Sequence, residues 1–168
     1  MSGRIPAGEL ADPGRVIGRL SDIGWGTRLR ELVGGEDAPV PKDVLDASVR
    51  VLAGWGWAER PVGVVGIGSR TRPHQLDHLA RRIADIGRLP LLGTLVPAGP
   101  HPEAHANSPQ RLAAVWTAFE EPGFEVPAGP ILLVDDVVDS GWTLTVAARR
   151  LRRAGATAVL PFALAQSA

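Results

Sequence analysis

Hydrophobic and polar positions follow two alternating patterns after residue 61. Short, fully apolar runs rich in Val, Ile and Leu are typical of strands buried on both faces of a parallel sheet. Between these runs, apolar residues recur every three or four positions, which is typical of helices with one buried face. The expected strands lie at residues 62–67, 89–96, 131–134 and 157–164, and the expected helices at residues 76–86, 108–119 and 143–151. Strands that alternate with helices predict an α/β fold with a mainly parallel sheet.

The first 60 residues have a different pattern, which predicts helices alone. Asp12 followed by Pro13 is a typical helix start, and the apolar positions from Val16 to Ile23 then keep a helical period. Further helices are expected at residues 27–33 and from Lys42 onward. We therefore expect a helical N-terminal subdomain at residues 1–60 and an α/β domain at residues 61–168.

The composition narrows the class of protein. The 18 basic and 18 acidic residues cancel, so no overall charge draws the chain to nucleic acid or to acidic lipid. The chain has no cysteine, which excludes disulfides and thiolate catalysis. It has neither an apolar run near 18 residues nor a recognisable signal peptide, so we expect a cytoplasmic protein with no membrane partner.

The stretch "ILLVDDVVDSGWT", residues 131–143, carries the clearest chemistry. Asp135 and Asp136 follow a buried strand, and ligands of parallel sheets bind at the carboxyl ends of strands. Carboxylates accept hydrogen bonds from vicinal hydroxyls, with or without a bridging Mg²⁺. The turn at residues 139–143 opens a helix, so its backbone N–H groups form an anion site. Carboxylates followed by an anion site indicate a sugar phosphate.

This stretch resembles the thirteen-residue signature of the type I phosphoribosyltransferases. The resemblance implies that Asp135 and Asp136 bind the ribose hydroxyls of phosphoribosyl pyrophosphate (PRPP), with Mg²⁺ carried by PRPP near the two carboxylates and no metal bound directly by the protein. It also implies a loop around the 5-phosphate, formed by Asp139, Ser140, Gly141, Trp142 and Thr143. In members that act on 6-oxopurines, an aspartate at the position of Asp139 serves as a base, which makes Asp139 a candidate catalytic residue.

Two other segments agree with this resemblance. Gly68, Ser69 and Arg70 follow the strand at 62–67 and resemble the family's pyrophosphate loop. The segment "NSPQRLAAVWTAF", residues 107–119, resembles the lid segment of ComF-like members, with Arg111 as its candidate catalytic cation. Three further stretches, "DIGWGTRLREL", "VLAGWGWAERPV" and "DSGWTLTVAARRLRRAGATAVLPFALA", resemble the phosphoribosyltransferase-like tail of actinobacterial RecQ-type DNA helicases.

Three motifs also suit other functions. An acidic pair after a strand also suits a phospho-receiver domain, but only 32 residues follow Asp136, too few for the units that such a domain still needs. His74 and His78 have a spacing able to bind zinc, although a solvated helix face is favoured. The arginines at positions 149, 150, 152 and 153 could contact nucleic acid, but a solvated helix face is again favoured.

The sequence is compatible with two main functions. The first is an enzyme that transfers a phosphoribosyl group to a nitrogenous base and releases pyrophosphate. The second is a non-catalytic module of a RecQ-type helicase that senses PRPP or a nucleotide, or that is purely structural. Trp142 departs from the family pattern, in which that position is small or basic, and the lid segment has no lysine. These departures count against turnover more than against PRPP binding. We also consider a homodimer and a direct contact with DNA.

Overall fold

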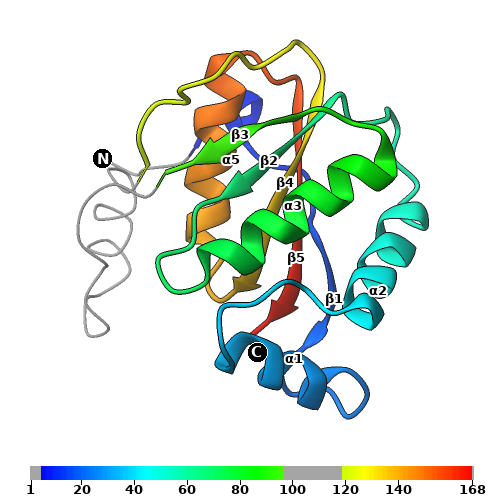
Figure 1. The fold of residues 1–168 in the computed structure, drawn as a ribbon. Helices are drawn as coiled ribbons and strands as arrows, with labels where there is room; N and C mark the ends of the chain where they lie inside the picture. Colours follow the sequence, from blue (N-terminus) through cyan, green and yellow to red (C-terminus); the bar gives the residue numbers. More distant parts are fainter. Residues whose placement is uncertain (1–4, 97–118, 168) are drawn as a thin grey trace.

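The computed structural model describes residues 5–96 and 119–167. Within these residues the chain forms a five-stranded sheet in the order β1-β5-β4-β2-β3, and every strand pair is parallel (Figure 1). The strands are β1 (Arg15–Arg19), β2 (Gly63–Ile67), β3 (Leu91–Leu95), β4 (Pro130–Val138) and β5 (Ala158–Gln166). The helices are the short 3-10 helix η1 (Ala7–Glu9) and α1 (Gly26–Gly34), α2 (Lys42–Ala53), α3 (Pro73–Gly87) and α5 (Trp142–Ala154).

The order of the strands determines which face each helix covers. The chain crosses from β2 to β3 in one direction along the sheet and from β4 to β5 in the other. Because crossovers between parallel strands are right-handed, α3 and α5 must lie on opposite faces. Helix α2 packs beside α3, and η1 packs against α5. Both faces of the central strands are therefore covered, which explains why β2 is buried at every position.

The structure confirms the predicted α/β fold class and its mainly parallel sheet. The strands predicted at 62–67, 89–96, 131–134 and 157–164 correspond to β2, β3, β4 and β5, and the helices predicted at 76–86 and from Thr143 correspond to α3 and α5. In the first 60 residues, α1 and α2 form where the pattern predicts them. The helix predicted at 108–119 lies outside the described residues except for Phe119, which is buried.

The helix predicted from Asp12 to Ile23 is wrong, because this segment contains β1. Val16 pairs with Ala163 of β5, and Gly14 approaches β5 so closely that a Cβ atom would lie 2.9 Å from the carbonyl oxygen of Pro161. Ile23, which a helix would have buried, is fully exposed. The β-branched pair Val16-Ile17 favours a strand, and the free edge of β5 supplies the hydrogen-bond partners that the strand needs.

The first part of the chain is therefore not helical throughout, since β1 belongs to the same sheet as the strands that follow residue 60. The division of the chain at residue 60 stays a prediction. Across the described parts of the chain, no helix is long and apolar enough to cross a membrane.

Two loops come together at the carboxyl-terminal end of the sheet. β2 and β4 are neighbours in parallel register, with Gly66 opposite Val134, so their carboxyl ends lie at the same edge. The loop after β2 contains Gly68, Ser69 and Arg70, and the end of β4 contains the acidic pair and the turn at 139–143. The fold therefore brings the two sequence motifs side by side.

Candidate functional site

The acidic pair lies inside the last third of β4 rather than after its end. β4 continues to Val138, so the extended backbone at Asp135 and Asp136 directs their side chains to opposite faces of the sheet. Asp135 is only 7% exposed and Asp136 is half-buried. The Asp135 carboxylate accepts a hydrogen bond from the N–H of Asp136 at 2.8 Å, and Asp136 accepts one from the N–H of Val137 at 2.7 Å.

The environment of Asp135 disfavours its charged form. Burial raises the pKa of the Asp135 carboxyl well above its ordinary value, and the adjacent charge of Asp136 raises it further. The N–H of Asp136 acts in the opposite direction but does not compensate. Keeping a carboxyl group in such a place costs stability, and hydroxyl donors or a cation from a ligand would reduce that cost. A strongly perturbed carboxyl at the carboxyl edge of a parallel sheet therefore marks a candidate functional site.

The turn between β4 and α5 is built around Gly141. This residue has φ of 81°, in the left-handed region, and forms the N-cap of α5. No atom lies within 4 Å of the position that a Cβ would take, so open space faces the turn. The N–H and the hydroxyl of Thr145 both donate to the Gly141 carbonyl, at 3.0 and 2.9 Å, and they hold the first turn of the helix in place.

The first turn of α5 leaves backbone donors free for an anion. Within the described residues, the N–H groups of Thr143 and Leu144 have no hydrogen-bond partner, and the N–H of Trp142 makes only a long contact of 3.5 Å to the hydroxyl of Ser140. Uncommitted N–H groups and the positive end of a helix favour a bound anion. A cavity of about 90 Å³ adjoins this turn, several times the space that one water molecule needs. It is lined by Asp135, Val137, Val138, Asp139, Ser140, Gly141, Thr143 and Leu144.

The cavity brings together most of the predicted residues of the motif. Asp135 lies at its base, and Asp139, Ser140, Gly141 and Thr143 line it, whereas Asp136 does not. The side chain of Trp142 does not line it either and instead packs against the hydrophobic core. The bulk of Trp142 is thus directed away from the space in which an anion would sit.

Ser167 is a contact of the site that the sequence pattern does not reveal. Its hydroxyl donates to the carboxylate of Asp139 at 2.6 Å, and its N–H donates to the carbonyl of Val138 at 2.9 Å. Ser167 follows β5, which is the neighbour of β4 in the sheet. The contact depends on that pairing and lies 28 positions away in sequence, so no local motif could have indicated it.

The loop after β2 makes hydrogen bonds inside the fold. The N–H of Gly68 donates to the carbonyl of Leu95 at 2.9 Å, and the hydroxyl of Ser69 accepts the N–H of Arg72 at 2.9 Å. Arg70 is exposed. A cavity of about 230 Å³ lies beside the loop and is lined in part by Gly68 and Ser69. Arg111, the candidate cation of the lid segment, lies outside the described residues.

The N-terminus of α3, which this loop precedes, already holds an internal anion. The carboxylate of Asp37 accepts the N–H groups of His74 and Gln75 at 3.1 and 2.8 Å. Partial burial acts against the charged form, but these two hydrogen bonds hold the pKa of Asp37 below its ordinary value. The ring nitrogen Nδ1 of His78 accepts the N–H of Val40 at 3.0 Å. Both histidines thus belong to contacts between α3 and the loop before α2, and the described residues contain no group of three or more metal-ligating side chains.

The four arginines of α5 make contacts within the chain. Arg149 and Arg153 pair with Glu9, and Arg152 donates to the carbonyl of Leu10 at 3.2 Å. Arg150 pairs with Glu121. The contacts to Glu9 and Leu10 fasten η1 and the residue after it to α5, and the pair with Glu121 fastens the segment before β4. These contacts favour a structural role for the arginines over a contact with nucleic acid.

Comparison with known proteins gives fold-level likeness only. No protein-family model and no curated protein sequence matches the chain. Similar solved structures include an adenine phosphoribosyltransferase at 15% identity and a TM-score of 0.49, covering 74% of this chain and 68% of that one. A purine phosphoribosyltransferase from Pyrococcus horikoshii Ot3 has 15% identity and a TM-score of 0.48, covering 79% and 89%. An adenine phosphoribosyltransferase from Leishmania tarentolae has 13% identity and a TM-score of 0.48, covering 75% and 72%. At these identities and scores, any functional conclusion depends on the chain's own motif and geometry.

Proposed function

We propose that this chain is a phosphoribosyltransferase-like domain that binds PRPP or another ribose 5-phosphate compound. One observation carries the proposal: the buried carboxyl group of Asp135 and a left-handed glycine turn with N–H groups unpaired within the described residues meet at one cavity, and Asp136 is the neighbour of Asp135 in β4. The carboxyl pair suits the hydroxyls of a ribose, and the turn suits its 5-phosphate. The resemblance of residues 131–143 to the type I phosphoribosyltransferase signature supports the same assignment.

The roles that we propose for the residues combine their positions with the family resemblance. Asp135, which lines the cavity, would accept a ribose hydroxyl, and the resemblance assigns Asp136 to the ribose as well. The N–H groups of residues 142–144 together with the hydroxyls of Ser140 and Thr143 would hold the phosphate. Mg²⁺ fits the site because it prefers a few carboxylate oxygens together with phosphate oxygens of the substrate, and it would neutralise charge on the pyrophosphate. The loop with Gly68, Ser69 and Arg70 lies at the same edge and would face the pyrophosphate.

The proposed reaction is displacement of pyrophosphate from C1 of the ribose by a ring nitrogen of a base. The C1–O bond breaks, the C1–N bond forms, and positive charge develops on the sugar in between. The protein contributes mainly by positioning the reactants and by placing the two carboxylates near that charge. Asp139 would accept the proton that the nitrogen loses, and Ser167 orients its carboxylate.

A second candidate is a non-catalytic module that binds PRPP or a nucleotide, attached to the helicase domains of a RecQ-type protein in the cytoplasm. The loop after β2 favours it, because the Gly68 N–H is engaged within the fold and is not free for a leaving group. A homodimer is compatible with either candidate.

Isothermal titration calorimetry with ribose 5-phosphate, and with PRPP and Mg²⁺, tests the proposal. We expect binding by the intact chain, and a loss of about 10- to 100-fold in affinity for each of Asp135→Asn and Asp136→Asn, since each removes a charged hydrogen-bond acceptor. Asp85→Asn, on the exposed face of α3, is the matched control and should bind normally. No binding of either ligand by the intact chain would refute the proposed function and PRPP binding by the second candidate. Binding without pyrophosphate release, across a panel of purines and pyrimidines, would select the non-catalytic module.

A further inference from the structure

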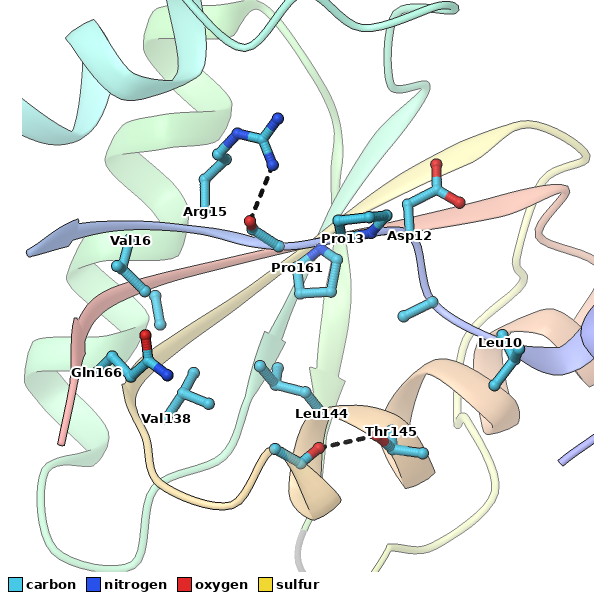
Figure 2. A pocket seen from close by; sticks show the side chains of 14 residues that line it. Leu10, Asp12, Pro13, Arg15, Val16, Val138, Leu144, Thr145, Pro161 and Gln166 are labelled. Atoms are coloured by element: carbon cyan, nitrogen blue, oxygen red, sulfur yellow. Dashed lines mark hydrogen bonds between the residues drawn. The ribbon is translucent and has the colours of Figure 1, made fainter. Parts of the chain in front are cut away.

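A second and larger cavity lies on the α5 face of the sheet, between α5, β5 and the start of β1 (Figure 2). Its volume is about 530 Å³, within the range typical of sites for small organic molecules. The segment from Leu10 to Gly14 forms one wall, and the pairing of Glu9 with Arg149 and Arg153 fastens the preceding residues to α5. The wall is therefore held in place by contacts of its own.

The interior of this cavity is uncharged. Val16, Val138, Leu144, Pro161 and Ala163 supply an aliphatic lining. Two charged residues also border the cavity, but Figure 2 shows the charged ends of Asp12 and Arg15 directed away from α5. The guanidinium of Arg15 lies 5.2 Å from the ring centre of Trp55 and donates to the carbonyl of Gly14. A charged ligand would lose its hydration here without gaining a partner of opposite charge.

One polar side chain gives the cavity a means of recognition. Figure 2 shows the amide of Gln166 beside Val138 and Val16. Within the described residues this side-chain amide has no hydrogen-bond partner, whereas the backbone carbonyl of Gln166 accepts the N–H of Leu20 at 2.9 Å. A glutamine amide presents one donor and one acceptor side by side, so it pairs with a molecular edge that offers the complementary pair.

We infer that this cavity is a second ligand site, for a neutral planar ring that carries an amide or amide-like edge. Aliphatic walls on the faces of the ring and the Gln166 amide on its polar edge match that chemistry. The site is distinct from the ribose phosphate cavity, because none of the four residues Asp135, Asp136, Asp139 and Ser140 lines it. The two cavities share Val138, Gly141 and Leu144 as walls, so they are immediate neighbours.

Benzamide is the probe that matches this chemistry, and benzoate is its anionic counterpart of the same shape. In ¹H–¹⁵N NMR spectra of the full chain, benzamide should shift the signals of Val16, Ala163 and the Gln166 side chain. Benzoate should bind at least about tenfold more weakly, because the cavity offers no cation. Absence of any shift with millimolar benzamide, or equal binding of benzoate, would overturn the inference.

Substitutions at Gln166 test the recognition directly. Gln166→Leu keeps the size of the side chain and should weaken benzamide binding about tenfold, the equivalent of two lost hydrogen bonds. Gln166→Glu should instead gain affinity for the cation benzamidine, since carboxylates pair with such forked donors. Full retention of benzamide binding by Gln166→Leu, or no gain of benzamidine binding by Gln166→Glu, would contradict the assignment of Gln166.

A substitution that fills the cavity provides a test independent of hydrogen bonding. Val16→Phe should abolish benzamide binding, and Val96→Phe, at a half-exposed position at the end of β3, is the matched control. Unchanged binding by Val16→Phe would place the benzamide elsewhere. A separate titration with ribose 5-phosphate distinguishes this inference from the proposed function. If only ribose 5-phosphate binds, the second site is refuted, and if only benzamide binds, the proposed function is refuted.

Discussion

Two helices begin at the same edge of the sheet, and only one of them has its N-terminus satisfied from within the chain. Helix α3 follows β2, and its first N–H groups are bound by the carboxylate of Asp37. Helix α5 follows β4, and the N–H groups of Thr143 and Leu144 have no partner within the described residues. The topology is the same, so position at the carboxyl edge does not by itself define an anion site. An N-terminus is available to a ligand only where no internal carboxylate occupies it.

The two loops before these helices differ in the same way. The loop before α3 is fixed by its own hydrogen bonds, including the one from the N–H of Arg72 to the hydroxyl of Ser69. The turn before α5 depends on a left-handed glycine that faces open space. Close to that turn, Asp135 is buried with its charged form disfavoured. The start of α5 thus combines N–H groups without partners and a buried carboxyl group whose charged form is disfavoured. This combination is typical of a binding site rather than of a stabilising motif.

Among substitutions that test the difference between the N-termini of α3 and α5, Gly141→Ala is expected to have the largest effect. A side chain in the left-handed region costs about 1–2 kcal/mol, and relief of that strain would rotate the N–H groups of the turn out of position. We expect the free energy of unfolding to fall by about that amount and the affinity for ribose 5-phosphate to fall about tenfold or more. Chemical denaturation and calorimetry measure the two effects.

Gly123→Ala is the matched control for that change, because Gly123 has ordinary φ and no atom within 4 Å of the added Cβ. It should leave both quantities unchanged. If Gly141→Ala binds ribose 5-phosphate as well as the unmodified chain does, the turn at α5 is not the phosphate site.

Asp135→Asn is expected to have the next largest effect, through the pH dependence of stability. The folded state raises the pKa of Asp135, so between the unfolded and folded pKa values the folded state holds more protons than the unfolded state. The stability that depends on this group is present below the unfolded pKa and is lost as the pH rises through the folded pKa. At pH 7 the asparagine variant should therefore be more stable, by on the order of 1 kcal/mol.

Urea denaturation of both proteins between pH 4 and pH 8 checks this expectation. The difference in the free energy of unfolding in favour of the variant should become smaller as the pH falls. A variant that is less stable at pH 7, or a difference that does not change with pH, would show that Asp135 is favourably accommodated as a carboxylate in the folded chain.

Asp37→Asn should have the smallest effect and the opposite sign. Hydrogen bonds from α3 lower the pKa of Asp37, so its contribution to stability is present above the unfolded pKa and is lost as the pH falls through the folded pKa. The variant should melt a few degrees lower at pH 7, and the difference should vanish in acid. Thermal melts followed by circular dichroism check this. Its affinity for ribose 5-phosphate should be unchanged, and a loss of affinity would mean that the two helix N-termini do not act separately.

Elements with a local signal in the sequence were predicted correctly, whereas an element that depends on long-range pairing was not. The apolar runs of β2, β4 and β5 and the periodic face of α3 were recognised because burial on the faces of a parallel sheet leaves a direct trace in composition. β1 was not recognised, because Asp12-Pro13 and the spacing of the apolar positions from Val16 to Ile23 are also typical of a helix. Only pairing with the edge of β5 decides between the two.

The same distinction between local and long-range signals holds for the candidate site. The sequence by itself determined the acidic pair, the glycine turn and the helix after it, since all three lie within thirteen consecutive residues whose chemistry is local. The tertiary structure decided the burial of Asp135, the contact between Ser167 and Asp139, and the occupation of the α3 N-terminus by Asp37. It also placed Gln166 beside a large cavity with an aliphatic lining next to the turn. Each of these joins residues that are distant along the chain, and such contacts arise only when the sheet order brings the segments together.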